Sequence, residues 1–319
     1  MSEQPEAIRI GISSCLLGEH VRFDGGHKRD SFLVDTFGRF VEWVPVCPEV
    51  ELGLGTPREA LRLVRTAEGV RMVNTRSKRD ISDQMRAWSL QRAEELAAER
   101  LAGYVLKKDS PSCGMERVKI YAESGMAEKQ GRGFFAEALI ARFPQLPVEE
   151  EGRLSDPRLR DNFVERVFAY VRLRAFFETR WTVGGLVGFH TAHKMTLLAH
   201  EPAIYDELGR LVAGAKGKDR QDLAARYRER FMDALAAMAT TRKHTNVLMH
   251  MAGHFKQVVD ADEKEELLTS IHDYRQGLVP LVVPLTLIRH HVRRHKVDYL
   301  AGQVYLDPHP KELMLRNHV

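Results

Sequence analysis

The sequence predicts two regions of different fold class: an α/β domain with a doubly wound, mainly parallel sheet, followed by an all-α helical bundle. Short β-rich runs alternate with helical patterns in the first half, whereas the pattern from residue 157 onward is almost wholly helical. A segment with two prolines and an acidic run, residues 143–153, reads as a linker. A chain of 319 residues is also too long for one comfortable core. We therefore expect domains over residues 1–148 and 153–319.

The elements of the first half follow from apolar runs bounded by turn residues. Strands are expected over residues 8–15, 41–46, 103–106 and 118–122, with an edge hairpin of residues 60–64 and 70–73. Helices are expected over residues 29–40, 82–101 and 133–143. This β-α-β order favours parallel strands joined by crossover helices.

The second half has the apolar spacing of amphipathic helices throughout. The first helix opens with Pro157, a residue favoured in a first helical turn. Helices are expected over residues 158–181, 183–200, 202–213, 219–239, 242–257, 261–277 and 283–297. The turn-rich tail, residues 299–316, is expected to pack back onto this bundle.

Several classes of protein are not indicated by the sequence. It has no Gly-x-Gly-x-x-Gly at a strand–helix junction and no Gly-x-x-x-x-Gly-Lys-Ser/Thr, so neither a dinucleotide nor a P-loop nucleotide is expected. The N-terminus lacks the basic and apolar regions of a signal peptide. The longest apolar stretch, residues 278–288, contains two prolines and is shorter than the roughly 18 residues of a membrane span. We expect a cytoplasmic protein without a membrane segment.

The three cysteines stand at equivalent places, since Cys15, Cys47 and Cys113 each follow a predicted strand. Loops after parallel strands share one crevice, where α/β proteins bind ligands. Their odd number argues against a disulfide framework. Buried apolar thiols are the alternative, but neighbouring Gly, Ser and Pro are poor surroundings for a hydrophobic side chain. The pattern predicts a metal site, and the spacing leaves open both zinc with a water and a 4Fe-4S cluster with one open iron.

Two side chains lie close to these cysteines in the sequence. Glu49 is two residues after Cys47, and Ser110 is three residues before Cys113. A carboxylate beside a partly dehydrated metal site suits a general base or acid. The alternatives are an ion-pair partner for Glu49 and a turn hydroxyl for Ser110. Further candidates for substrate binding are Ser14, Arg22, Asp24, Lys107, Lys108 and Ser112.

The two halves differ in charge. Residues 153–319 carry 26 Lys and Arg against 20 Asp and Glu, which leaves a net charge of −2 for residues 1–152. Such a basic half suggests contact with a polyanion, although a solvated helical surface also explains it. The candidate RNA contacts are Lys194, Arg242, Lys243, Arg293, Arg294 and Lys296.

Twelve of the fourteen histidines also follow residue 152. His250 and His254 are four residues apart, but no Glu follows His250, so the zincin signature is missing. His290, His291 and His295 invite a similar metal interpretation. We favour buried or hydrogen-bonded structural histidines over a second metal site.

Several motifs together resemble the thiouracil desulfidase (TudS-like) family over residues 7–145. They are Cys15 with the loop over residues 21–26, Cys47-Pro48-Glu49, and residues 107–114. The helical half resembles an uncharacterised domain often fused to it, through residues 189–194, 197–200, 244–250 and 299–306. The whole chain is similar to the RudS-like tRNA 4-thiouridine desulfidases.

This resemblance implies a 4Fe-4S cluster on Cys15, Cys47 and Cys113, with the fourth iron open to a substrate sulfur. It also implies catalytic roles for Glu49 and Ser110. The implied reaction converts 4-thiouridine in tRNA to uridine and releases hydrosulfide, with no net redox change. The alternatives are a desulfidase of free thiouracil bases and a non-catalytic RNA-binding protein with a redox-sensing cluster.

Overall fold

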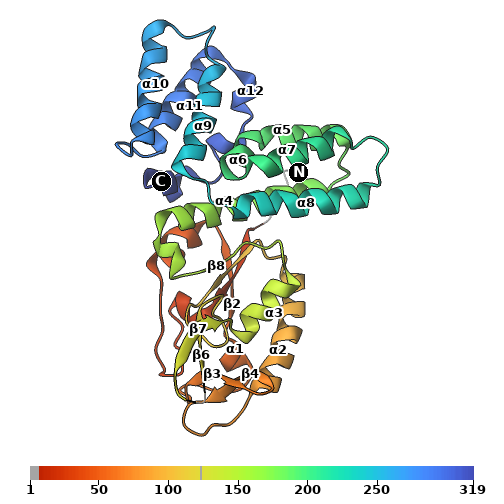
Figure 1. Cartoon of the computed structure of the whole chain (residues 1–319), viewed down its shortest axis with the longest axis vertical. Helices are drawn as coiled ribbons and strands as arrows, with labels where there is room; N and C mark the ends of the chain where they lie inside the picture. Colours follow the sequence, from red (N-terminus) through yellow and green to blue (C-terminus); the bar gives the residue numbers. More distant parts are fainter. Residues whose placement is uncertain (1–6, 123) are drawn as a thin grey trace. The chain divides into compact units, whose positions relative to one another are not determined.

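The computed structural model describes residues 7–122 and 124–319, and the chain divides into two units between Ser155 and Asp156 (Figure 1). Among the described residues, the strands all lie in the first unit, and the second unit is helical. This confirms the predicted order of an α/β region followed by an all-α region. The expected linker is partly wrong, because Val148–Glu150 form strand β8 of the first unit.

The first sheet is fully parallel and has the strand order β2-β1-β5-β8. Its strands are β1 (Arg9–Ser13), β2 (Glu42–Val46), β5 (Gly103–Leu106) and β8 (Val148–Glu150). Ile12 of β1 pairs with Pro45 of β2 and Val105 of β5, so the carboxyl ends of these strands lie level. The residues of β5 are buried throughout, as expected for a strand in a parallel sheet covered on both faces.

The remaining strands make a second sheet, with the order β4-β3-β6-β7. Its strands are β3 (Leu61–Thr66), β4 (Gly69–Asn74), β6 (Val118–Tyr121) and β7 (Ala127–Gly131). Two antiparallel hairpins are joined by the parallel pair β3–β6. The expectation that the first hairpin lies at the edge of one common sheet is therefore wrong. Strand β7 escaped prediction because four of its five residues are exposed and it lacks an apolar alternation.

Helices α2 (Ser82–Glu95) and α3 (Phe134–Arg142) pack against each other in this unit. A helix expected over residues 29–40 is instead a π-type turn, Phe32–Thr36, followed by a 3-10 turn, Phe37–Arg39. The amide of Phe37 is shared between the carbonyls of Leu33 and Phe32, which widens the turn beyond α-helical geometry.

The second unit contains the predicted helices with shifts of their ends, and a short helix that was not predicted, α12 (Asp298–Ala301). The others are α4 (Pro157–Glu178), α5 (Val183–Ala192), α6 (Lys194–His200), α7 (Pro202–Ala213), α8 (Arg220–Ala236), α9 (Thr241–Gly253), α10 (Ala261–Arg275) and α11 (Val282–His295). The helix expected over residues 183–200 breaks at His193. No described helix is both long and apolar enough to cross a membrane.

Two apolar cores hold the helical unit together. One gathers residues of α4, α5, α7 and α8, including Leu173 and Phe231. The other gathers residues of α6, α9, α10 and α11, including Leu248 and Leu285. Tyr305 belongs to this second core, which confirms that the C-terminal tail packs onto the bundle.

Polar residues at the helix starts explain where the helices begin. Their side chains accept hydrogen bonds from backbone amides of the first turn. These N-caps are Asp156, Thr182, Asp219, Thr240 and Asp260. Asp260 and Glu263 form a reciprocal capping box at the start of α10.

Candidate active site

The loops after β1, β2 and β5 enclose a cavity of about 530 Å³ that is lined by Cys15, Cys47 and Cys113. Cys15 lies in a 3-10 turn directly after β1, and Cys47 is the N-cap of the short helix α1 (Pro48–Glu51). Cys113 lies in the loop after β5 and is buried. Three cysteines that are far apart in the sequence therefore face one cavity, because parallel strands deliver their following loops to the same edge.

The spacing of the three sulfurs bears on the kind of metal they suit. Cys15, Cys47 and Cys113 do not form a group in which all sulfurs lie within 4.8 Å of one another. A single zinc ion, with Zn–S bonds of about 2.3 Å, requires sulfurs roughly 3.8 Å apart. The three sulfurs are therefore not arranged as the ligands of one zinc ion.

Burial disfavours the charged form of all three thiols. It raises the pKa of Cys15 to about 11, although the nearby Lys107 cation partly offsets this. Burial likewise raises the pKa of Cys47, and that of Cys113 to well above its ordinary range. Metal ligation requires thiolates, so a bound cationic group must compensate for their desolvation. A soft, buried donor set of this kind fits an iron–sulfur cluster.

Glu49 is held between two partners at the wall of the cavity. Its Oε2 atom accepts hydrogen bonds from Arg58 Nε at 2.8 Å and Arg58 Nη2 at 2.5 Å. Its Oε1 atom accepts a hydrogen bond from Ser112 Oγ at 2.8 Å. The side chains of Arg58 and Glu49 are only 6% and 13% exposed, so this ion pair is largely shielded from water. The carboxylate is therefore fixed in position by a bidentate clamp.

The hydroxyls continue this line of hydrogen bonds. Ser110 Oγ lies 3.0 Å from Ser112 Oγ and accepts a hydrogen bond from the backbone amide of Cys113 at 3.0 Å. Because Ser112 donates its one hydroxyl proton to Glu49, Ser110 must donate to Ser112. The result is a directed line from Ser110 through Ser112 to Glu49, and we call Arg58, Glu49, Ser112 and Ser110 the polar relay.

Sequence reasoning missed Arg58 and the role of Ser13. Arg58 lies in the loop before β3, and its only sequence signal is a cation in a Gly- and Pro-rich segment nine residues after Glu49. Ser13 is buried at the end of β1, where its hydroxyl accepts a hydrogen bond from the Lys107 amide at 3.0 Å. Both residues line the cavity.

The remaining substrate-binding candidates have different surroundings. Ser14, Arg22, Lys107 and Lys108 line the cavity, whereas Asp24 does not. The Asp24 carboxylate lies 3.3 Å from Arg22 Nε, so it orients this cation.

The charge of Lys107 is largely engaged within the unit. Its ammonium forms an ion pair with Glu151, and both side chains are nearly buried. The same carboxylate accepts a hydrogen bond from the Lys108 amide at 2.8 Å.

The RNA-contact candidates lie in the helical unit and differ in exposure. Arg242, Arg293, Arg294 and Lys296 are exposed, whereas Lys194 and Lys243 are half-buried. Two of the six have carboxylate partners within the unit. Lys243 Nζ lies 3.4 Å from Glu201 Oε2, and Arg294 Nη1 lies 2.9 Å from Glu263 Oε1.

Four histidines of this unit are structural, which confirms that part of the expectation. His190, His193, His200 and His244 are buried, and each Nδ1 atom is hydrogen-bonded within the unit. Burial lowers the pKa of His193 and of His244 to about 3, and that of His190 to about 4. His190, His193 and His244 are therefore neutral core residues at physiological pH.

Comparisons with known proteins match the two units separately. Residues 10–151 match the family model "2-thiouracil desulfurase", and residues 194–310 match DUF1722, a protein family of unknown function. The uncharacterized protein YbgA of Escherichia coli (strain K12) is 35% identical over 161 residues, which are 50% of this chain and 95% of YbgA.

Among solved structures, the chain is similar to the 4Fe-4S-dependent thiouracil desulfidase TudS. The two are 31% identical, and the match covers 46% of this chain and 93% of TudS with a TM-score of 0.38. The chain belongs to the 2-thiouracil desulfurase family as a TudS-like two-domain member with a C-terminal DUF1722 region, and it is a desulfidase.

Proposed function

We propose that this desulfidase converts 4-thiouridine in tRNA to uridine and releases hydrosulfide, at a 4Fe-4S cluster held in the cavity. The observation that carries the proposal is the polar relay, which brings a fixed carboxylate and two serine hydroxyls to the wall that Cys47 and Cys113 share. A structural ion pair alone would not require this directed line of hydroxyls.

Cys15, Cys47 and Cys113 would hold the cluster. Their sulfurs are not all within 4.8 Å of one another, so they do not form the close set that a single zinc ion requires. The solved relative TudS is itself described as 4Fe-4S-dependent. When bound through three cysteines, a cluster supplies one open iron, a soft Lewis acid that prefers a thiocarbonyl sulfur to a carbonyl oxygen.

The protein side chains then manage water and protons. Glu49 accepts a proton from a water molecule, and the resulting hydroxide forms a bond to C4 of the pyrimidine. The C4–S bond breaks with its electron pair on sulfur, and the hydroxyl on C4 loses its proton and becomes the carbonyl oxygen. Arg58 keeps the carboxylate aimed at the water. The hydrogen bonds of the polar relay then reverse, the proton on Glu49 passes through Ser112 and Ser110 to the sulfur, and the hydroxyl proton makes the second S–H bond. Water and thiouracil yield uracil and hydrogen sulfide, so no oxidant or reductant is consumed.

The charges at the cavity favour a nucleotide over a free base. Arg22, Lys28 and Lys108 line it, and a neutral pyrimidine needs none of these cations. The exposed Arg242, Arg293 and Lys296 of the helical unit suit the phosphates of a folded RNA. We propose that the helical unit binds tRNA in the cytoplasm.

Substrate preference separates this function from the alternative of a free-thiouracil desulfidase. Cluster-reconstituted full-length protein is given thiolated tRNA, 4-thiouridine or free 4-thiouracil under anaerobic conditions. We expect the highest kcat/KM on tRNA. Equal or higher kcat/KM on the free base would favour the scavenging alternative. Failure to release sulfide from any substrate, with the cluster bound, would contradict the proposed activity.

A further inference from the structure

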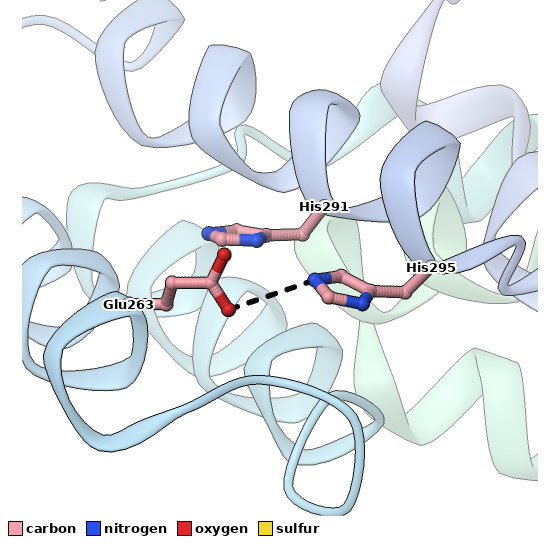
Figure 2. A group of neighbouring side chains, drawn as sticks. All are labelled: Glu263, His291 and His295. Atoms are coloured by element: carbon pink, nitrogen blue, oxygen red, sulfur yellow. Dashed lines mark ion pairs between the residues drawn. The ribbon is translucent and has the colours of Figure 1, made fainter.

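Outside the cavity, a second group of metal-ligating side chains lies between α10 and α11, and it consists of Glu263, His291 and His295. Each offers one ligand atom, and these atoms all lie within 4.8 Å of one another. Figure 2 shows the carboxylate of Glu263 and the two imidazole rings pointing toward one another. A search of the described residues for three or more His, Cys, Asp or Glu side chains with the spacing of a single-ion site finds this group.

The helices produce this arrangement by their local geometry. His291 and His295 are one turn apart on α11, so they share a face, and their rings stack with centroids 5.8 Å apart. Glu263 is the third residue of α10, where the capping box with Asp260 fixes its backbone and carboxylate. Helices α10 and α11 pack against each other, which brings the carboxylate to the histidines.

The polar atoms of this group lack the partners that buried groups normally have. Glu263 Oε1, His291 Nδ1 and His295 Nε2 are shielded from solvent and make no hydrogen bond within the described part of the chain. Arg294 Nη1 lies 2.9 Å from Glu263 Oε1 as an ion pair, but without hydrogen-bond geometry. His295 Nε2 is 3.7 Å from Glu263 Oε2, too long for a hydrogen bond.

A bound metal ion gives these nitrogen and oxygen atoms the partner that they lack. Two imidazoles and one carboxylate are a ligand set of zinc and related divalent ions, whereas Mg²⁺ and Ca²⁺ prefer oxygen alone. Ligand atoms of a tetrahedral zinc ion lie roughly 3.3 Å apart, close to the 3.7 Å between His295 and Glu263. We propose that Glu263, His291 and His295 bind one divalent transition-metal ion of the zinc class, which links the first turn of α10 to the last turn of α11.

The site is structural rather than catalytic. His291 is only 3% exposed, and the side chains of His295 and Glu263 are 16% and 15% exposed, so little room remains for a substrate. Binding of the ion stabilises the folded helical unit by linkage. Arg294 has to leave Glu263 as the ion enters, because its guanidinium competes for the same carboxylate.

The test is calorimetric titration of Zn²⁺ into chelator-treated, cluster-reconstituted full-length protein. We expect His295→Gln to weaken one zinc-binding event by at least 10–100-fold, the loss typical of even an outer-shell change. Glu263→Gln should also weaken it, while keeping the capping box, since Gln serves at that position. His290→Gln is the matched control, because His290 neighbours the group without belonging to it.

Two measurements make the result independent of folding and of the cysteines. Arg294→Gln should tighten zinc binding roughly two- to fivefold, because it removes the competing ion pair. Zn²⁺ at a hundredfold excess over its Kd should raise the Tm of the helical unit by roughly 5–10 °C, whereas Mg²⁺ should not. Equal zinc binding by wild type and His295→Gln would overturn the site, whether or not the protein desulfurates thiouridine.

Discussion

The cavity and the α10–α11 group present two sets of three donors that differ in spacing and in the state of their partners. The cavity combines three sulfurs that are not all within 4.8 Å with a polar relay whose members satisfy one another. The α10–α11 group combines close-set nitrogen and oxygen atoms that lack hydrogen bonds within the described residues. The difference separates the two proposed ligands, because an iron–sulfur cluster takes soft sulfur donors, whereas a close-set pair of imidazoles with a carboxylate suits a single zinc-class ion.

The largest effect is expected from the loss of one cysteine sulfur in the cavity. Cys113→Ala removes a proposed ligand from the buried side of the cavity. We expect loss of the visible absorbance of the cluster and a fall in kcat of at least about 1,000-fold, measured as sulfide release. Zinc binding at the α10–α11 group should not change. Sulfide release at the wild-type rate would show that the cysteines do not hold the reactive group.

Glu49→Gln tests whether the relay performs chemistry. The substitution keeps the shape of the side chain but cannot accept a proton from water. We expect kcat to fall by about 10²–10⁴, the usual contribution of general acid–base catalysis, with the cluster absorbance unchanged. Unaltered kcat would assign Glu49 a purely structural ion pair with Arg58.

Substitutions of Arg58 test whether holding the Glu49 carboxylate in position matters separately from the positive charge beside it. Arg58→Ala should lower kcat about 10–100-fold with little change in KM, because a small misplacement of a catalytic group costs rate rather than binding. It should also lower the free energy of unfolding by about 3–5 kcal/mol, since it leaves a shielded carboxylate unpaired. Arg58→Lys should restore stability better than kcat, because lysine cannot form the bidentate clamp. Equal recovery of both quantities would argue against positioning.

A fall in pH should lower the stability of the helical unit before that of the α/β unit. The pKa of His193 and of His244 is lowered to about 3 by burial, from an ordinary value of 6.5. Between these values the unfolded chain binds more protons than the folded chain, so stability is full above pH 6.5 and falls as the pH drops toward 3. Hydrogen exchange read by mass spectrometry should therefore show the helical unit opening first on acidification from pH 7 to 5. Equal protection of both units over that range would contradict this.

The smallest expected effect concerns RNA. Arg293→Ala and Lys296→Ala should each weaken tRNA binding about two- to fivefold and lower the salt slope by about 1. Sulfide release from free 4-thiouracil should stay unchanged. A matched control is Arg226→Ala, an exposed arginine of α8 paired with Asp222. Equal effects of all three substitutions would indicate non-specific attraction rather than a defined contact surface.

Much of the fold was accessible from local patterns in the sequence. Apolar periodicity, with Pro157 at the start of the first helix, located the helices of the second unit, because such signals act within one or two turns. The positions of Cys15, Cys47 and Cys113 after strands were likewise sufficient to expect one shared cavity.

Other features depended on packing between distant segments. The second sheet was not foreseeable, because the pairing of Leu63 with Ile120 joins two runs whose patterns allow several partners. The clamp of Arg58 on Glu49 and the approach of Glu263 to His295 were hidden for the same reason.

The sequence by itself determined which backbone segments form helices and strands and where the cysteines stand at their ends. Only the tertiary structure decided which charged and polar side chains meet, because a local pattern encodes the buried face of an element but not its neighbour.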